Sequence, residues 1–434
     1  MLQNTDRMTP EGTPARPERP ALAGHPGLTT SLWVVLGLLA AVTPFATEFY
    51  LPAFPQMVKD LGTSPTGIQL TLSAYFVGIA VGQLLFGPLS DRLGRRGPLI
   101  AGTSICLIAA VASALAPNVE VLVAARFVQA LAGAAGMVIG RAVISDVAVG
   151  REAARAFSLM MMVLATAPIV APIAGSLLAT TVGWRGILWT VCAMIAVMLA
   201  AVVLFVPESY PRERREHARA VNAGARPVVV ALRSRTYVGN MLAFAMSFAA
   251  LMAYMSASPF VFQVMAGLSP VAYGILYGII ALVLVLSSAV SARFTASHAV
   301  GGLLGLGITV FVAATLTLLA LVLAGVPAIW FAIPIVAADA SLGLILGNAS
   351  SLALGAVPQV VGTASAILGT VQFGLGAAVT PLVSIAGEDT AVPLAIIMAT
   401  CALLAGGAFL STRVWRPATA LHPASRAADE TASG

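Results

Sequence analysis

The sequence has very little charge. Asp, Glu, Lys and Arg make up 9% of its 434 residues, apolar residues make up 59%, and the mean hydropathy is +0.96. A soluble domain usually carries about 25% charged residues, because charge is what covers a surface that faces water. The shortage of charge therefore excludes an ordinary soluble fold and predicts a chain whose surface faces lipid.

Cysteine and histidine are also scarce. The three cysteines, Cys106, Cys192 and Cys401, each lie in an apolar run without a CxxC pair or a nearby histidine. We expect them to be small packing residues and not part of a disulfide or a metal site. No histidine stands deep in an apolar run beside an acid, and the sequence has no GxxxxGK[ST] phosphate loop or nucleophile elbow. We therefore expect no enzyme, no ATP-driven pump and no cofactor.

Twelve runs are long and apolar enough to cross a membrane as helices, which takes about 20 residues. The first six lie at 30–52, 67–89, 97–116, 120–143, 156–182 and 185–206. The second six lie at 236–263, 270–292, 298–324, 328–355, 360–386 and 390–412. The predicted fold class is an all-α membrane protein.

A charged segment at 207–235 divides the runs into six and six, and halves of equal span number are typical of duplicated transporters. The predicted organisation is thus a bundle at 30–206, a cytoplasmic linker at 207–235 and a second bundle at 236–412. The ends at 1–29 and 413–434 are polar, and we expect disordered cytoplasmic tails there. The first of them has no apolar h-region, so we expect no signal peptide.

Arginine dominates the basic residues, at 22 against one lysine, and it is distributed unevenly. With the N-terminus inside, the inner segments carry 20 of the 23 basic residues, the outer segments carry Lys59 and Arg185, and Arg126 stands within a span. This bias is the positive-inside pattern. It predicts that both termini are cytoplasmic, and it accounts for the net charge of +6 without nucleic-acid binding.

The loop after the second apolar run reads GPLSDRLGRRGP. It combines glycines that permit a tight turn with an acid and three arginines: Gly87, Gly94, Asp91, Arg92, Arg95 and Arg96. Read from the residues alone, this is a positively charged turn on the cytoplasmic side.

That loop resembles the signature loop of the major facilitator superfamily, and the twelve spans extend the resemblance over essentially the whole chain. In that family the acid and arginines of the loop steady one conformation during alternating access. The resemblance therefore implies a conformational latch at Gly87, Asp91, Arg92, Gly94, Arg95 and Arg96. The matching loop of the second half, SARFTASHAVGG, keeps Arg293 and lacks the acid, so the latch is expected on one side only.

Other stretches resemble the twelve-span drug/proton antiporters of this superfamily, in particular the Bcr/CflA subfamily of bicyclomycin- and chloramphenicol-type exporters. They are EFYLPAFP, QLTLSAYFVGIAVGQLLFGPLSDRLGRR, RFVQALAGAAG, APIVAPIAG and VGTASAILGTVQFGLGA. The resemblance implies an antiporter motif at Pro168, Pro172 and Gly175 and a role in proton transfer for the arginine of the third stretch, Arg126. Three positions depart from the subfamily pattern: Glu48 stands where Asp is usual, and Ala171 and Ser176 stand where glycines are common.

Glu48, Arg126 and Asp339 are charged residues within predicted spans, where an ionised side chain costs about 2.5–3.5 kcal/mol, while Arg141 and Asp146 lie at a cytoplasmic end. Glu48 either reaches outer water at the end of its run or faces a central cavity, where a desolvated carboxyl can exchange a proton near neutral pH. Arg126 either extends to the outer surface or reaches that cavity and favours the ionised form of Glu48. Asp339 is either a second proton or cation site or a helix cap near Pro334. We predict that Glu48, Arg126 and Asp339 couple transport to protons.

Tyrosines, methionines and amides within apolar spans are candidates for binding a substrate, because they offer polar groups or adaptable apolar contacts. The predicted substrate-binding residues are Tyr50, Tyr75, Gln129, Met161, Tyr254, Asn348 and Gln372. For each of them the alternative is packing inside the bundle or contact with lipid.

The expected function is proton-coupled efflux of small, largely apolar drugs across the bacterial cytoplasmic membrane by alternating access. Its partners would be a small-molecule substrate, protons and the lipid bilayer, with no nucleic acid, and we expect a monomer. The alternative is export of a physiological solute, such as a sugar or an amino acid, by the same fold.

Overall fold

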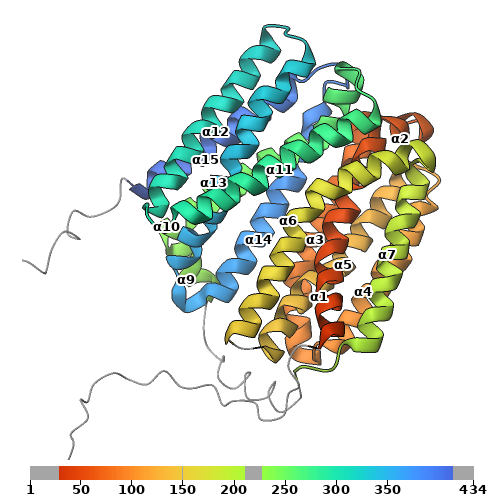
Figure 1. Cartoon of the computed structure of the whole chain (residues 1–434), viewed down its shortest axis with the longest axis vertical. Helices are drawn as coiled ribbons and strands as arrows, with labels where there is room; N and C mark the ends of the chain where they lie inside the picture. Colours follow the sequence, from red (N-terminus) through yellow and green to blue (C-terminus); the bar gives the residue numbers. More distant parts are fainter. Residues whose placement is uncertain (1–28, 149, 211–226, 414–434) are drawn as a thin grey trace, which may run out of the picture.

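The computed structural model describes residues 29–148, 150–210 and 227–413, and all regular structure in those ranges is helical (Figure 1). Twelve of the described segments are long and apolar enough to cross a membrane. The predicted all-α membrane fold is confirmed. The predicted tails, apart from one residue at the inner end of each, and most of the predicted linker lie outside the described residues.

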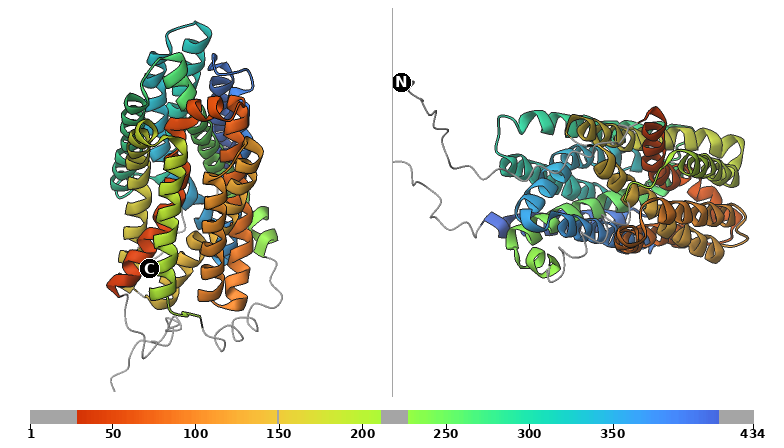
Figure 2. Two further views of the ribbon diagram at one scale, coloured as in Figure 1. Left: turned by 90° about the vertical axis from the view of Figure 1, so that its right-hand side faces the viewer. Right: turned by 90° about the horizontal axis from the view of Figure 1, so that it is seen from below.

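The first half of the chain contains α1 (Thr30–Glu48), η1 (Leu51–Ala53), α2 (Phe54–Asp60), α3 (Pro65–Leu93), α4 (Arg96–Ala114), α5 (Val119–Val147), α6 (Gly150–Thr181) and α7 (Gly183–Phe205). The second half contains α9 (Pro227–Arg233), α10 (Arg235–Pro259), η2 (Phe260–Met265), α11 (Pro270–Phe294), α12 (Val300–Leu323), η3 (Ala328–Phe331), α13 (Ala332–Gly355), η4 (Pro358–Val360), α14 (Val361–Val379), η5 (Thr380–Ser384) and α15 (Val392–Arg413). The helices of each half pack chiefly among themselves (Figure 2), and the halves meet mainly through α3 with α14 and α6 with α11.

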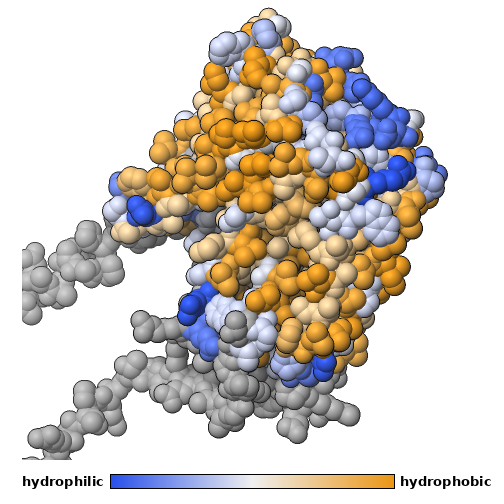
Figure 3. Space-filling view, turned by 45° about the vertical axis from the view of Figure 1, so that its right-hand side comes forward, coloured by the Kyte–Doolittle hydropathy of each residue, from blue (hydrophilic) through white to orange (hydrophobic). Residues whose placement is uncertain are grey.

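The outer surface is strongly apolar. Large side chains such as Ile108, Leu204 and Ile385 are each about 70% exposed. Figure 3 shows one apolar face, with polar side chains gathered mostly toward the two ends of the helices. Such a surface is unfavourable in water and suits the hydrocarbon region of a bilayer.

The first span is longer than expected, and its helix is interrupted. It covers Ser31–Asp60, so the predicted end at residue 52 is wrong. Helix α1 ends at Glu48, the 3₁₀ turn η1 follows, and α2 completes the span. Pro52 and Pro55 explain the interruption, because neither has an N–H to donate to the carbonyl four residues earlier. As a result, Glu48 lies near the middle of the span and not at its outer end.

Glycines bring α3 and α5 into close contact. A Cβ atom added at Gly78 or Gly82 would collide with the carbonyl oxygen of Phe127 or Leu131 on α5. Small residues commonly permit such backbone approach between membrane helices. The close packing places the side chain of Arg126, on α5, against the tyrosines of α3 and against α1.

The two ends of the helices differ in charge. We call the end that carries the 94–96 turn between α3 and α4 the arginine side, because Arg92, Arg95 and Arg96 gather there. It lies toward the bottom of Figure 1, where α9 also lies, while α2 lies at the opposite side.

Candidate functional site

A cavity of about 370 Å³ lies between the two halves. Helices α1, α3, α5 and α6 form its wall from the first half, and α10 and α14 form it from the second. Apolar side chains cover most of this wall: Phe76, Ile79, Met137, Leu164, Phe248, Leu251, Met252, Met255, Leu368 and Phe373. Among the described residues of the wall, Glu48 and Arg141 are the charged ones. An apolar wall with a few polar groups is typical of a small-molecule site.

Glu48 lines this cavity and does not reach the opposite surface. Its side chain is 7% exposed, and its Oε2 atom has no hydrogen-bond partner among the described residues. Neither of the two ion pairs found in the described ranges involves it. A buried ionised carboxylate without a partner is costly. The proton-coupling role of Glu48 stays a prediction, and its burial beside a cavity is what the structure adds.

Arg126 is completely buried and lies between two aromatic rings. Its guanidinium carbon is 4.4 Å from the ring centroid of Tyr50 and 4.5 Å from that of Tyr75. Its Nη1 donates to Gln129 Oε1 at 3.1 Å, and its Nη2 donates to the carbonyl oxygen of Ala46. That carbonyl belongs to the last turn of α1, where carbonyl groups lack partners within the helix. Arg126 thus caps the interrupted first helix two residues before Glu48, and it forms no ion pair with Glu48.

The substrate-binding residues predicted from the sequence fall into separate places. Tyr50, Tyr75 and Gln129 surround Arg126, and the Tyr50 hydroxyl is 3.2 Å from Thr71 Oγ1. In the second half Asn348 Nδ2 donates to Ser291 Oγ at 3.0 Å, and Tyr254 is buried on α10. Met161 is 50% exposed, and of the seven residues only Gln372 lines the cavity.

Sequence reasoning missed much of the cavity wall. On α10 the wall is formed by Phe248, Leu251, Met252 and Met255. Their spacing of three and four residues places them on one face of the helix. That periodicity was readable in the sequence, but α10 is apolar on every side, so the pattern alone does not show which face meets the cavity.

Asp339 lies on α13, away from the cavity wall, and is 3% exposed. Helix α13 runs from Ala332 to Gly355 without interruption, so Asp339 does not cap a helix end near Pro334. In the described ranges its carboxylate has neither a hydrogen bond nor an ion pair. The helix-cap alternative is therefore excluded, and the proton or cation site stays a prediction.

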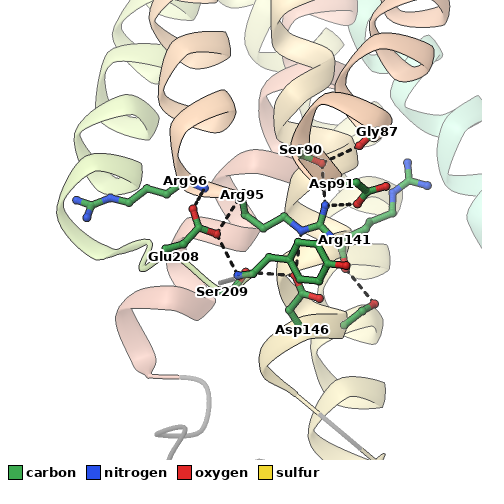
Figure 4. Close-up of polar contacts among 11 residues, drawn as sticks. Gly87, Ser90, Asp91, Arg95, Arg96, Arg141, Asp146, Glu208 and Ser209 are labelled. Atoms are coloured by element: carbon green, nitrogen blue, oxygen red, sulfur yellow. Dashed lines mark hydrogen bonds and ion pairs between the residues drawn. The ribbon is translucent and has the colours of Figure 1, made fainter. Parts of the chain in front are cut away.

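The predicted latch is a network on the arginine side (Figure 4). Arg95 forms ion pairs with Asp91 at 2.7 Å and with Asp146 at 2.9 Å, and it donates to Ser90 Oγ at 2.8 Å. Burial lowers the pKa of Arg95, but hydrogen bonds to Asp146 and Asp91 outweigh that effect and raise it. Arg95 therefore stays charged and holds the turn to the end of α5.

A glutamate that the sequence analysis did not identify completes the network. Glu208, which follows α7, accepts hydrogen bonds from the backbone N–H groups of Arg95 at 2.8 Å and Arg96 at 3.2 Å. Gly94 ends α3 with a φ of +98°, a conformation that favours glycine. Gly87 contributes a carbonyl that accepts from Ser90 Oγ at 3.0 Å, and Arg92 is exposed. The whole network lies within the first half.

The predicted antiporter motif lies on α6, which continues through Pro168 and Pro172. Pro168 lines the cavity. At Gly175 an added Cβ atom would collide with the backbone carbonyl of Phe49. The motif therefore lets α6 approach the interruption of the first span directly beside Glu48.

The two halves are joined by hydrogen bonds on the side opposite the arginine side. Gln69 Nε2 donates to Ser384 Oγ at 2.8 Å and to the Ser256 carbonyl at 3.3 Å. Thr66 donates to the Ser384 carbonyl at 3.1 Å, and Gln263 donates to the Pro52 carbonyl at 3.0 Å. These contacts seal the molecule there, while the cavity extends from Glu48 toward Arg141 near the arginine side.

A family model described as Major Facilitator Superfamily matches residues 36–381. The chain belongs to the major facilitator superfamily. This is a family of membrane transporters, and with twelve apolar helices the chain is a multi-pass membrane protein.

Relatives of this superfamily member include drug-resistance proteins. A bicyclomycin resistance protein homolog of Haemophilus influenzae is 29% identical over 86% of this chain and 93% of its own length. A chloramphenicol resistance protein of Pseudomonas aeruginosa is 29% identical over 85% of this chain and 87% of its own length. An uncharacterized MFS-type transporter, YdgK of Bacillus subtilis, is 35% identical over 87% and 94%. The resemblance to bicyclomycin- and chloramphenicol-type exporters is confirmed.

Solved structures share the fold. The crystal structure of a D-xylose-proton symporter superposes with a TM-score of 0.70 at 15% identity, covering 86% of this chain and 96% of the symporter. A bacterial homolog of the human lysosomal transporter Spinster, in an inward-facing and occupied conformation, gives 0.69 at 16% identity over 90% and 98%. At these identities the likeness extends to the major facilitator fold alone.

Proposed function

We propose that this protein exports small, largely apolar drugs across the cytoplasmic membrane in exchange for protons. The observation that carries the proposal is Glu48, the one acid among the described residues that line a largely apolar cavity between the two halves. The relatives named for bicyclomycin and chloramphenicol resistance support the substrate class. One chain supplies both sides of the cavity, so a monomer suffices.

The proposed orientation places the arginine side in the cytoplasm, with both termini, as the positive-inside bias favours. The seal around Gln69 then closes the outer side, and the cavity is in its inward-facing form. A drug entering from the cytoplasm meets Glu48, which releases its proton inward. After the halves rock to open the outer side, the drug leaves and Glu48 takes a proton from outside.

In this proposal Arg126 positions Glu48 and does not exchange a proton. It holds the Ala46 carbonyl and so fixes the end of α1 that carries Glu48. A guanidinium stays charged at every physiological pH. Its contact with α1 therefore persists through the transport cycle, while Glu48 is the group that changes charge.

Export of a polar solute finds less support in the cavity. A sugar would need a hydrogen-bond partner for most of its hydroxyl groups, and an unpaired buried polar group costs about 1–3 kcal/mol. The wall is covered mainly by phenylalanine, methionine and leucine. Such a wall favours largely apolar molecules with few polar groups.

The test is Glu48→Gln, which keeps size and polarity but cannot release a proton. We expect cells producing this variant to lose resistance to chloramphenicol and bicyclomycin, and inside-out vesicles to show no drug-induced proton movement. Glu120→Gln is the matched control, because Glu120 is an exposed acid at the start of α5. If Glu48→Gln exported either drug against its gradient at the wild-type rate, the proposed coupling would be disproved.

A further inference from the structure

Arg141 brings a positive charge to the wall of the cavity between the halves. It takes part in neither of the two ion pairs found in the described ranges, because Asp91 and Asp146 both pair with Arg95. Figure 4 shows its side chain pointing away from Asp146. A guanidinium stays charged at every physiological pH. The wall therefore carries a permanent positive charge that the transport scheme built on Glu48 does not use.

Arg141 and Glu48 lie at different depths of the cavity. A Cβ atom added at Gly140, the residue before Arg141, would be 3.5 Å from Leu39 Cδ1, so this turn of α5 is level with Leu39 of α1. Glu48 follows Leu39 by nine residues on the same helix, which is about 14 Å at 1.5 Å per residue. Arg141 lies six residues before the end of α5 on the arginine side, so it marks that end of the cavity.

The cavity wall also offers neutral hydrogen-bond donors toward this end. Ser365 lines the cavity from the start of α14, which lies next to α9 on the arginine side (Figure 1). Gln83 lines it from α3 and lies against α14, since a Cβ atom added at Gly369 would be 2.7 Å from its Oε1 atom. A hydroxyl and an amide can both donate to an acceptor. With Arg141, this end suits a ligand group that is anionic or rich in acceptor oxygens.

Aromatic rings from both halves provide a place for the apolar part of such a ligand. The ring of Phe373, on α14, is 6.0 Å from that of Phe76 on α3 and 5.6 Å from that of Phe248 on α10. All three side chains line the cavity. Aromatic rings favour contact with other rings in tilted or edge-on arrangements. The wall therefore suits a molecule with an aromatic body.

We propose that Arg141 is a specificity-determining residue that selects substrates by charge. It binds an anionic or electron-rich group of an aromatic substrate at the arginine-side end of the cavity, while the apolar body lies against the phenylalanine rings. A permanent cation is disfavoured, because like charges repel strongly where water is partly excluded. The proposal deepens the proposed function and rests on it, since it names which molecules the same cavity accepts.

Two ions of nearly the same size and shape test the charge preference. Tetraphenylborate is an anion and tetraphenylphosphonium is a cation, and each carries four phenyl rings. Equilibrium dialysis measures the binding of each ion to the full-length Glu48→Gln protein in detergent micelles, with empty micelles as the background. Glu48→Gln leaves Arg141 as the charged residue among the described residues of the wall. We expect this protein to bind the borate at least about tenfold more tightly than the phosphonium.

Substitutions in the same Glu48→Gln background assign the preference to one side chain. Arg141→Gln should bring the two affinities within about twofold of each other, whereas Arg141→Lys keeps the charge and should retain the preference. Arg155→Gln is the matched control. Arg155 is an exposed arginine near the start of α6 that does not line the described cavity wall, so its loss should leave the preference unchanged.

Three results would overturn the proposal: equal binding of the two ions by the Glu48→Gln protein, a preference that survives Arg141→Gln, or an equal loss in Arg155→Gln. If Arg141→Gln does not fold, Ser365→Asp places a carboxylate at the same end of the cavity and must lower the preference at least about threefold. An unchanged ratio in that variant also refutes the role of Arg141. Conversely, absent drug export by the wild type together with the charge preference refutes only the proposed function.

Discussion

Replacing Arg126 by lysine tests the central feature of the first half. The guanidinium lies between the rings of Tyr50 and Tyr75 and donates to Gln129 and to the Ala46 carbonyl. Lysine keeps the charge but has a single compact ammonium group in place of a planar fork. It cannot face both rings and reach both acceptors, so we expect it to lose one ring contact and one hydrogen bond.

The magnitude follows from those two losses. A hydrogen bond made by a charged group contributes about 1.5–3 kcal/mol, and a desolvated cation–π contact contributes about 2 kcal/mol. Arg126→Lys should therefore lower the free energy of unfolding by about 3.5–5 kcal/mol. Because Ala46 precedes Glu48 by two residues, the end of α1 loses its cap as well. We expect drug export to fall at least about tenfold, the equivalent of about 1.4 kcal/mol.

The assay is reversible unfolding in mixed detergent micelles, together with drug export in inside-out vesicles. Arg185→Lys is the matched control, because Arg185 makes the same two kinds of contact on the surface. It donates to the Ala116 carbonyl at 3.2 Å and lies 4.1 Å from the Trp184 ring. An exposed contact of that kind is worth about 1 kcal/mol or less. Equal losses of stability in the two variants would refute the role assigned to Arg126.

Three further predictions concern the network around Arg95, the motif on α6 and the hydrogen bonds that join the halves around Gln69. Asp146→Asn should lower the free energy of unfolding by about 1.5–3 kcal/mol, and Asp91→Asn should lower it by about 0–1 kcal/mol. The difference arises because the Asp146 side chain is 10% exposed and that of Asp91 is 62% exposed. A larger loss for Asp91→Asn than for Asp146→Asn would contradict this. Gly175→Ala should impair folding and export, because its Cβ would strike the Phe49 carbonyl. In the control Gly347→Ala the added Cβ meets nothing within 4 Å, so this variant should be tolerated. Equal behaviour of the two variants would count against the close approach of α6 to Phe49. Gln69→Leu removes two of the four hydrogen bonds that join the halves, at about 1 kcal/mol each. Pulsed electron resonance measures the distance between spin labels attached at the exposed Ser64 and Asp389. In Gln69→Leu we expect a larger share of long label-to-label distances than in the wild type. An unchanged distance distribution would refute the role of Gln69 in holding the halves together.

Much of the fold could be predicted because membrane insertion depends on local composition. Hydropathy alone located twelve spans, and the described helices follow them closely. It failed at the end of the first span, which was placed at residue 52, whereas the chain turns at Pro52 and Pro55 and continues to Asp60. A proline removes a hydrogen bond wherever it stands, but the neighbouring helices decide whether the span stops or only bends.

The candidate site was predicted unevenly, and the reason is physical. The sequence by itself determined that Glu48, Arg126 and Asp339 are charges inside apolar runs, which need a role or a partner. Only the tertiary structure decided what they meet: a cavity for Glu48, two tyrosine rings for Arg126 and the buried interior of the second half for Asp339. Hydropathy fixes how long a helix is and that it lies in the membrane. Which side chains face one another depends on the rotation and tilt of each helix, and packing between helices sets these.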